Sequence, residues 1–258
     1  MIDVAAAADR LWEAIRTRRS IAPLTDEHPG LTVDDAYEIQ DAVVARYADS
    51  GAPVTALKLG LTSRAKQTQM GVDEPLYGWL TASMALDVGE ELDTDALIQP
   101  RAEPEIAFLI GRDLDDPATT AADVLAATTA VAPAVDVLDS RFAGYRFTLP
   151  DVAADNSSAG RYLVGGRLSP PDALDLRVLG CAFWKNGELV ATATGAASLD
   201  HPAAAVAWAV RKLASRGQGL AAGRWVLSGA LTAAVPLAAG DHVLVEFDRI
   251  GSVELRAR

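Results

Sequence analysis

The chain has 258 residues, of which 50% are hydrophobic and 22% are charged, and its formal net charge at pH 7 is -12. This composition is typical of a globular enzyme with a substantial core, and the negative charge disfavours nucleic acid and membrane surfaces as partners. A single cysteine excludes an intrachain disulfide, no apolar run reaches membrane-spanning length, and the N-terminus lacks a basic targeting segment. We therefore expect a cytoplasmic enzyme.

The N-terminal third of the chain is predicted to be mainly helical. Apolar side chains between residues 4 and 15 recur at the spacing of one helical face. Thr32 and Asp35 then match the pattern of a helix-capping box, which predicts a helix that continues to about Tyr47. A turn-rich segment separates these two helices.

A short apolar run over residues 55–61 is interrupted by one lysine, Lys58, and is predicted to be a strand. Alternation along a strand places Lys58 on the face opposite Leu57 and Leu59, toward a cavity. A buried lysine needs an anion to keep its charge. The alternative is an ordinary lysine that extends into solvent from an edge strand.

After about residue 85, short β-like runs alternate with turns. Two helices are predicted among them, one from near Thr120 to just before Pro133 and one that begins after Asp200 and ends at Gly217. Asn186, which is followed by glycine, is a strong signal for a two-residue hairpin. The predicted strands cover residues 106–110, 134–138, 178–184, 189–194, 225–228, 242–247 and 252–256.

Together these elements predict an α+β protein, with a mainly helical N-terminal region over residues 1–84 packed on a mixed, β-rich catalytic core over residues 85–258. Cys181 lies in an apolar run and is predicted to be a core residue instead of a nucleophile. The three histidines lack zinc-site spacing, and the chain has no P-loop, dinucleotide fingerprint or G-x-S-x-G motif.

Two acidic residues, Glu103 and Glu105, stand two positions apart at the start of an apolar run. In an extended chain, residues i and i+2 point to the same side, so these carboxylates project together. Two like charges held side by side repel each other unless a positive group lies between them. A hard divalent cation is the simplest such group.

A third acid, Asp136, lies within the apolar run 132–138. A carboxylate buried among valine and leucine needs a partner, because burial of an isolated charge is very costly. Glu103, Glu105 and Asp136, on two predicted strands, therefore form a candidate set of oxygen ligands for Mg²⁺ or Mn²⁺. The alternative is that the glutamates are solvated strand-edge charges and that Asp136 pairs with an arginine.

The segment from Asp155 to Arg161 is small, polar and turn-forming. Such a loop can offer backbone N–H groups, hydroxyls and a guanidinium to a carboxylate, although many loops of this composition are surface turns. Arg141 follows the strand of Asp136 and could pair with an acid of the site, but a structural ion pair is the favoured prediction. The turn over residues 229–232 begins with a glycine, which lets the backbone approach a ligand closely.

Six segments, taken together, carry a pattern that is more specific than any single motif. They are Lys-Leu-Gly-Leu-Thr-Ser at 58–63, Gly-Val-Asp-Glu-Pro at 71–75, and the segments 101–108, 133–141, 152–158 and 229–240. In order and spacing they resemble the 2-keto-4-pentenoate hydratase/4-oxalocrotonate decarboxylase family, within the fumarylacetoacetate hydrolase superfamily. The resemblance covers nearly the whole chain and implies a fumarylacetoacetate-hydrolase-like core.

The resemblance also implies the site. It implies Mg²⁺ or Mn²⁺ held by a Glu-x-Glu pair and a later acid, which match Glu103, Glu105 and Asp136. The last ligand of the family is usually glutamate, so the side chain here is one methylene shorter. The family's catalytic lysine matches Lys58, and the serine of its D-N-x-S turn matches Ser158.

Leu76 is the position that distinguishes the two reactions of the family. The hydratases carry an acid in the segment after the Gly-Val-Asp-x-Pro motif, whereas Leu76 resembles the aliphatic residue of the decarboxylases. Leucine cannot transfer a proton, and the addition of water needs an acid/base group. The aromatic and basic residues over 140–147 are similar to those of the same branch.

The decarboxylase branch implies conversion of 2-oxohex-3-enedioate (4-oxalocrotonate), formed in the meta-cleavage breakdown of catechols, to 2-hydroxypenta-2,4-dienoate. For this small anionic 2-oxo acid, the candidate binding residues are Asn156 and either Arg161 or Arg146. Two alternatives stay open: a 2-hydroxypenta-2,4-dienoate hydratase and a noncatalytic partner of the pathway hydratase. A homo-oligomer and a complex with the pathway hydratase are also expected.

Overall fold

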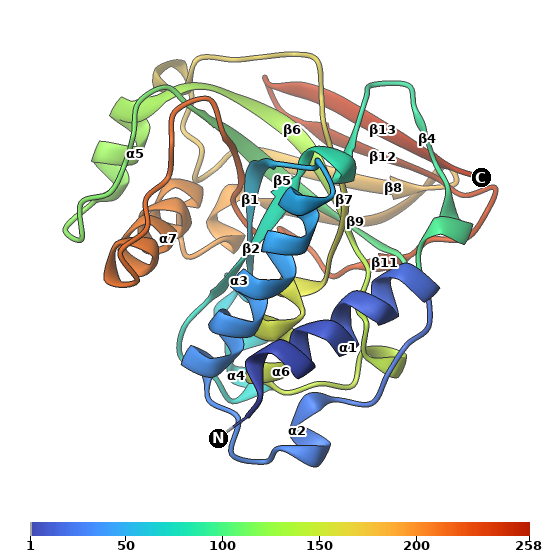
Figure 1. Cartoon of the computed structure of the whole chain (residues 1–258). Coiled ribbons are helices and arrows are strands. Elements are labelled where there is room, and N and C mark those ends of the chain that lie inside the picture. Colours follow the sequence, from blue (N-terminus) through green and yellow to red (C-terminus); the bar gives the residue numbers. More distant parts are fainter. Residues whose placement is uncertain (1) are drawn as a thin grey trace.

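The computed structural model describes residues 2–258, so Met1 lies outside the described part of the chain. Its strands form one eight-stranded and one five-stranded sheet, and the helices lie around them (Figure 1). This arrangement confirms the predicted α+β class. Within residues 2–258, no helix is both long and apolar enough to cross a bilayer.

Three helices open the chain, and two of them were predicted. They are α1 (Val4–Thr17), α2 (Leu24–Glu27) and α3 (Val33–Asp49). The capping box predicted for α3 is present, because the Thr32 hydroxyl accepts from the Asp35 N–H and the Asp35 carboxylate accepts from the Thr32 N–H. These helices share a small core, which includes Leu11, Ile39 and Phe142 and is distinct from the main core.

The eight-stranded sheet holds most of the predicted site residues. Its strand order is β2-β1-β10-β5-β6-β7-β3, and β11 pairs with β5. The bounds are β1 (Val54–Gly60), β2 (Leu76–Thr81), β3 (Ala85–Leu86), β5 (Arg101–Ile110), β6 (Thr128–Leu138), β7 (Ala159–Val164), β10 (Trp225–Leu227) and β11 (Val235–Pro236). Because β1 and β2 precede residue 85, the regions predicted over 1–84 and 85–258 share this sheet.

The eight-stranded sheet curls, so that its inner face encloses a core of its own. Thr55 on β1 and Tyr162 on β7 belong to strands that are well separated in the strand order, yet their hydroxyl oxygens lie 2.9 Å apart. This inner core combines small side chains, including Ala56, Ala107 and Ala134, with larger ones such as Tyr162. The curl therefore brings side chains of β1, β5 and β6 together from different directions.

The second sheet packs against the outer face of the first and contributes to the main core. Its strands, in spatial order, are β4 (Glu91–Leu92), β13 (Gly251–Ala257), β12 (His242–Phe247), β8 (Gly180–Lys185) and β9 (Glu188–Thr194). The predicted hairpin is confirmed, because β8 pairs with β9 across Asn186 and Gly187, which both have positive φ. Cys181 is buried in this sheet, and burial raises the pKa of its thiol to about 12, as expected for a core residue.

The other helices fit the sequence prediction less uniformly. They are α4 (Arg64–Met70), α5 (Ala121–Ala127), α6 (Leu149–Ala154) and α7 (Pro202–Ser215). The prediction of a helix up to Pro133 is wrong in its second half, because β6 already begins at Thr128. Threonine and valine in this segment favour a strand, and β6 is paired on both sides. Strands β2 and β7 and helix α6 were not predicted.

Candidate metal centre and active site

The polar residues of the candidate site form one layer on the inner face of the curled sheet. Lys58, Glu105 and Asp136 come from β1, β5 and β6, and each is two residues from an alanine of the inner core. Those alanines are Ala56, Ala107 and Ala134. Because residues two apart on a strand share a face, the polar layer lies directly beside the layer of small methyl groups.

Strand register brings the three acids together. Glu103 lies opposite Asp136 in the antiparallel β5–β6 pair, and Glu105 follows two residues along the same face of β5. One carboxylate oxygen from each acid lies within 4.8 Å of the others, and all three side chains are buried. The prediction that these side chains converge is therefore consistent with the geometry, and the alternative of solvated edge charges does not fit their burial.

Lys58 is 1% exposed and its ammonium group reaches this cluster. Its Nζ lies 2.9 Å from Oδ2 of Asp136 and donates a hydrogen bond of 2.7 Å to the backbone carbonyl of Ser157. The Ser157 hydroxyl is a more distant acceptor at 3.4 Å. Asp136 thus pairs with a lysine, and not with an arginine as the alternative supposed.

Glu105 is fully buried and its two oxygens differ. Oε2 accepts a 2.5 Å hydrogen bond from the backbone N–H of Gly229, whereas Oε1 has no hydrogen-bond partner within the described part of the chain. Burial, followed by the charge of Asp136, raises the pKa of Glu105 well above its ordinary value. Gly229 has a φ of +101°, and a Cβ there would lie 2.1 Å from the Thr62 hydroxyl oxygen, so this backbone approach requires glycine.

This donor set fits a hard divalent cation. Three carboxylates supply oxygen ligands, and the buried Oε1 of Glu105 lacks a partner that a cation would provide. A cation would also counteract the raised pKa of Glu105, because a nearby positive charge favours the ionised carboxylate. The shorter side chain of Asp136 still places an oxygen in the group.

A strained turn holds the acceptor of Lys58. Asn156, Ser157 and Ser158 have φ values of 52°, 55° and 52°, which is rare for three successive residues other than glycine. The Asn156 side chain pairs with the backbone of Trp79 on β2, through its amide group at 2.7 Å and its carbonyl oxygen at 2.7 Å. Gly78 makes the close approach possible, because a Cβ there would lie 2.4 Å from the Asn156 carbonyl oxygen.

A buried ion pair fixes the beginning of the same turn. The Arg141 guanidinium bonds the carboxylate of Asp155, the Asp155 carbonyl and the Ala159 carbonyl. The prediction of a structural ion pair for Arg141 is therefore confirmed. Ser158 donates a 3.3 Å hydrogen bond to the Asp155 carboxylate, so this serine belongs to the same network.

A cavity of about 150 Å³ opens beside the carboxylates. Its polar lining includes Lys58, Glu103 and Ser158, and Leu76 forms part of its apolar wall. Sequence reasoning missed further lining residues, namely Gly60, Leu61, Leu138, Tyr145, Phe147, Val152 and Ser157. All of them lie in the segments 58–63, 133–141, 140–147 and 152–158, which the sequence pattern had singled out, but the sequence did not show that these side chains line one cavity.

The three predicted substrate-binding residues lie elsewhere or have other partners. Asn156 is buried and uses both ends of its amide on β2. Arg146 is exposed and forms a bidentate pair with Asp26. Arg161 lines a different cavity. The structure therefore brings together Lys58 and the three acids but gives these three residues no contact with the cavity.

Comparison with known protein families gives a match over most of the chain. Residues 48–258 match the model of the fumarylacetoacetate (FAA) hydrolase C-terminal family. A 4-oxalocrotonate decarboxylase of Pseudomonas sp. (strain CF600) is 41% identical over 98% of this chain and 96% of its own. A 2-hydroxyhexa-2,4-dienoate hydratase of Comamonas testosteroni is also 41% identical, over 96% of this chain and 94% of its own.

Solved structures give the same relation. A 4-oxalocrotonate decarboxylase from Pseudomonas putida G7, complexed with magnesium and adipate, has a TM-score of 0.96 at 39% identity, covering 99% of this chain and 97% of that chain. A fumarylpyruvate hydrolase from Pseudomonas aeruginosa has a TM-score of 0.61 at 16% identity, covering 80% of this chain and 90% of that chain. The second likeness concerns the fold alone.

Proposed function

The chain belongs to the fumarylacetoacetate hydrolase family, and we propose that it is a metal-dependent lyase that decarboxylates 2-oxohex-3-enedioate to 2-hydroxypenta-2,4-dienoate. Full-length relatives at about 40% identity are named for this decarboxylation or for the related hydration, so the family narrows the reaction to two. The choice between them depends on the cavity.

We assign Glu103, Glu105 and Asp136 as the residues that hold Mg²⁺ or Mn²⁺. When bound, such an ion supplies a positive charge that stabilises the negative charge developing on the 2-oxo oxygen of the substrate. Two hydrogen-bonded strands fix the positions of the three carboxylates, and the Gly229 N–H holds Glu105 in place by donating to its Oε2.

The observation that carries the proposal is the position of Leu76. It is 2% exposed and lines the cavity beside Lys58, where an acid would be needed to handle the proton of a water molecule. Among the described residues that line the cavity, Glu103 is the sole carboxylate, and we assign it to the metal. This wall therefore offers no separate general acid or base of carboxylate type for hydration.

Decarboxylation does not need such a group. The bond between C5 and C6 breaks, its electron pair moves along the conjugated chain to the 2-oxo oxygen, and C6 leaves as CO₂. No proton is abstracted in this step. An apolar wall formed by Leu76, Phe147 and Val152 excludes water and favours loss of the carboxylate's charge as neutral CO₂ forms.

Lys58 and Ser158 complete the proposed machinery. The ammonium group of Lys58 forms an ion pair with Asp136 and donates one short hydrogen bond, to the Ser157 carbonyl. Its contact with the Ser157 hydroxyl is long, at 3.4 Å, so this N–H group can turn to the developing negative charge or to a substrate carboxylate. Ser158 lines the cavity and steadies the turn through Asp155.

Hydration of 2-hydroxypenta-2,4-dienoate is the second candidate, because a hydratase is as similar in sequence as the decarboxylase. The test is to incubate the purified protein and Mg²⁺ with each substrate separately, and to measure CO₂ release from the first and loss of the diene absorbance from the second. CO₂ release supports decarboxylation, and water addition alone refutes it. If the protein catalyses neither reaction but binds the pathway hydratase tightly, it is a noncatalytic partner.

A small organic acid as substrate agrees with the family. We further propose a homo-oligomer that acts in the cytoplasm and associates with the hydratase that consumes its product. Light scattering of the purified chain, alone and mixed with that hydratase, measures both associations. A monomeric mass in both samples would contradict them.

A further inference from the structure

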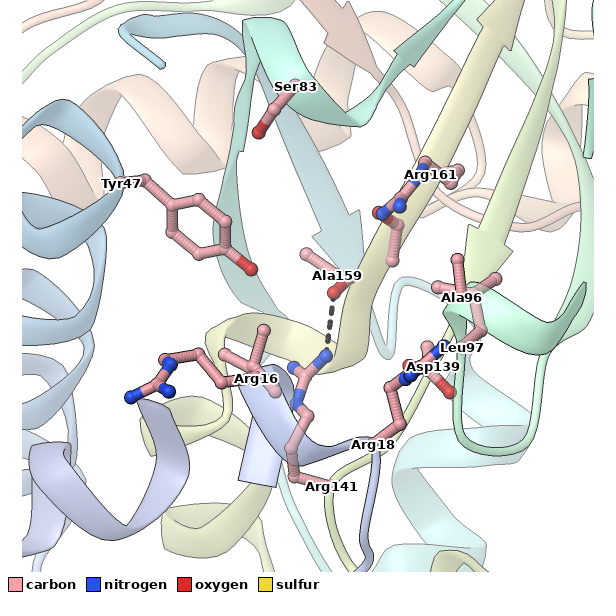
Figure 2. A pocket seen from close by; sticks show the side chains of 12 residues that line it. Arg16, Arg18, Tyr47, Ser83, Ala96, Leu97, Asp139, Arg141, Ala159 and Arg161 are labelled. Carbon is pink, nitrogen blue, oxygen red and sulfur yellow. Dashed lines mark hydrogen bonds between the residues drawn. The ribbon is translucent and has the colours of Figure 1, made fainter. Parts of the chain in front are cut away.

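A second cavity, of about 270 Å³, lies between the ends of α1 and α3 and the strand β7 (Figure 2). It shares no lining residue with the cavity beside the three acids. Figure 2 shows Arg141 in the middle of this group, between Tyr47 and Arg18, with Arg161 above and the guanidinium of Arg16 turned outward. Neither the proposed reaction nor the family relation assigns a role to this cavity.

The charge of this cavity is opposite to that of the chain. The net charge of the protein is -12, yet the cavity is lined by four arginines and one aspartate, Asp139. Arg141 is neutralised by its buried pair with Asp155. Asp139 accepts from the backbone N–H groups of Ile98 and Gln99, which carry no net charge, so its carboxylate offsets one of the other three arginines. The remaining arginines thus give a local excess of positive charge in an acidic protein.

The contacts of these arginines leave their charge uncompensated. Arg18 donates to the Asp95 carbonyl at 2.8 Å, and Arg161 donates to the Gly160 carbonyl at 3.0 Å. Carbonyl oxygens satisfy a donor but carry no net charge. Among the described side chains, no ion pair joins either arginine to a carboxylate. Each guanidinium also has further N–H groups in a planar fork, which matches the oxygens of a carboxylate or phosphate.

The arginines that line this cavity differ in burial. Arg16 and Arg18 are exposed at the rim, whereas Arg161 and Tyr47 are half-buried further in. Arg16 has a long, solvent-exposed contact of 3.3 Å with Glu13, which is too weak to neutralise the cavity. A rim that attracts anions and a half-buried donor that fixes them is the arrangement that a small anion requires.

We propose that this cavity binds a small oxyanion, either a carboxylate or a phosphate, through Arg18 and Arg161 and the hydroxyl of Tyr47. The site is separate from the carboxylate cluster and does not depend on the proposed reaction. Its volume of about 270 Å³ fits a compact acid of a few carbons or a phosphate group. Arg161 lines this cavity and is not among the residues that line the cavity beside the three acids.

Calorimetric titration of the EDTA-treated full chain with sodium phosphate and, separately, with sodium adipate tests the proposal. Without metal, the buried carboxylates repel anions, so saturable heat reports the arginine cavity. We expect Arg18→Gln and Arg161→Gln each to weaken binding about tenfold, which is the loss typical of one charge-assisted contact. The control Arg249→Gln removes the same charge from an exposed position and should bind as the wild type does.

Binding of phosphate alone identifies a phosphate ligand, binding of adipate alone identifies a dicarboxylate, and either result supports the site. Absence of saturable binding with both anions overturns the proposal. Unchanged affinity in Arg18→Gln and Arg161→Gln also overturns it. Arg18 is exposed, so its variant keeps the test valid if Arg161→Gln does not fold, which circular dichroism establishes.

Discussion

Replacement of Glu105 by glutamine should make the metal-free protein more stable and should remove its stabilisation by Mg²⁺. Burial, then Asp136, raises the pKa of Glu105 above its ordinary value of 4.5, so the folded state binds this proton more tightly than the unfolded state. The stability of the metal-free protein is therefore full below pH 4.5 and falls as the pH rises from 4.5 through the raised pKa. A glutamine has no such proton to lose.

The size of the effect follows from the shift. Each unit by which the pKa of Glu105 exceeds the ordinary value costs the ionised wild type about 1.4 kcal/mol at high pH. For a chain of this length, about 1 kcal/mol corresponds to a change of about 2–4 °C in the unfolding temperature. Mg²⁺ at about 100 times its Kd would stabilise the wild type by about 2.7 kcal/mol, or about 5–10 °C.

Thermal unfolding at pH 8, in EDTA and in Mg²⁺, measures both effects. We expect Glu105→Gln to melt above the wild type in EDTA, to gain little from Mg²⁺ and to be nearly inactive. Glu188→Gln, the same substitution at an exposed position of β9, should change none of these values. A variant that melts below the wild type in EDTA contradicts the electrostatic argument, and an unchanged response to Mg²⁺ contradicts the assignment of Glu105 as a ligand.

Three further substitutions test the cavity. Leu76→Asp should slow CO₂ release and introduce water addition; unchanged decarboxylation would show that this position does not set the reaction. Lys58→Met should lower kcat by a factor of about 10²–10⁴, and a normal kcat would exclude the lysine from catalysis. In EDTA, the same variant should lower the free energy of unfolding, measured in urea, by about 3–5 kcal/mol. Gly78→Ala should lower the free energy of unfolding by about 1–3 kcal/mol, because its Cβ would meet the backbone of Asn156. Gly180→Ala is the control, because a Cβ there would meet no atom within 4 Å. Equal unfolding midpoints for the two variants would refute the close approach.

The sequence predicted those parts of the site that depend on short-range geometry. Alternation along a strand placed Glu103 and Glu105 on one face and Lys58 opposite its leucine neighbours, and the structure shows both features. Asp136 needed only the expectation that a buried acid requires a partner. The buried strand β2 was missed because it has no exposed face, so its sequence has no alternation.

The rest depended on long-range contacts that no local pattern encodes. The ion pair between Lys58 and Asp136 exists because the sheet curls, and strand order cannot be read from periodicity. The arginines were the most ambiguous residues. A guanidinium near the predicted site can bind a substrate, hold a turn or face another cavity, and here Arg141 holds a turn, Arg146 lies on the surface and Arg161 faces another cavity.

The features that are hardest to explain by stability coincide with the proposed machinery. The polar layer on the inner face replaces apolar side chains that would pack beside the alanines, and it leaves Glu105 with a raised pKa. The turn over residues 156–158 holds three residues in a disfavoured conformation and requires Gly78 and a buried ion pair to keep it there. Each of these features lowers the stability of the folded chain. Their common consequence is that one ammonium and three carboxylates are fixed together beside the cavity, which is the preorganisation that electrostatic catalysis requires.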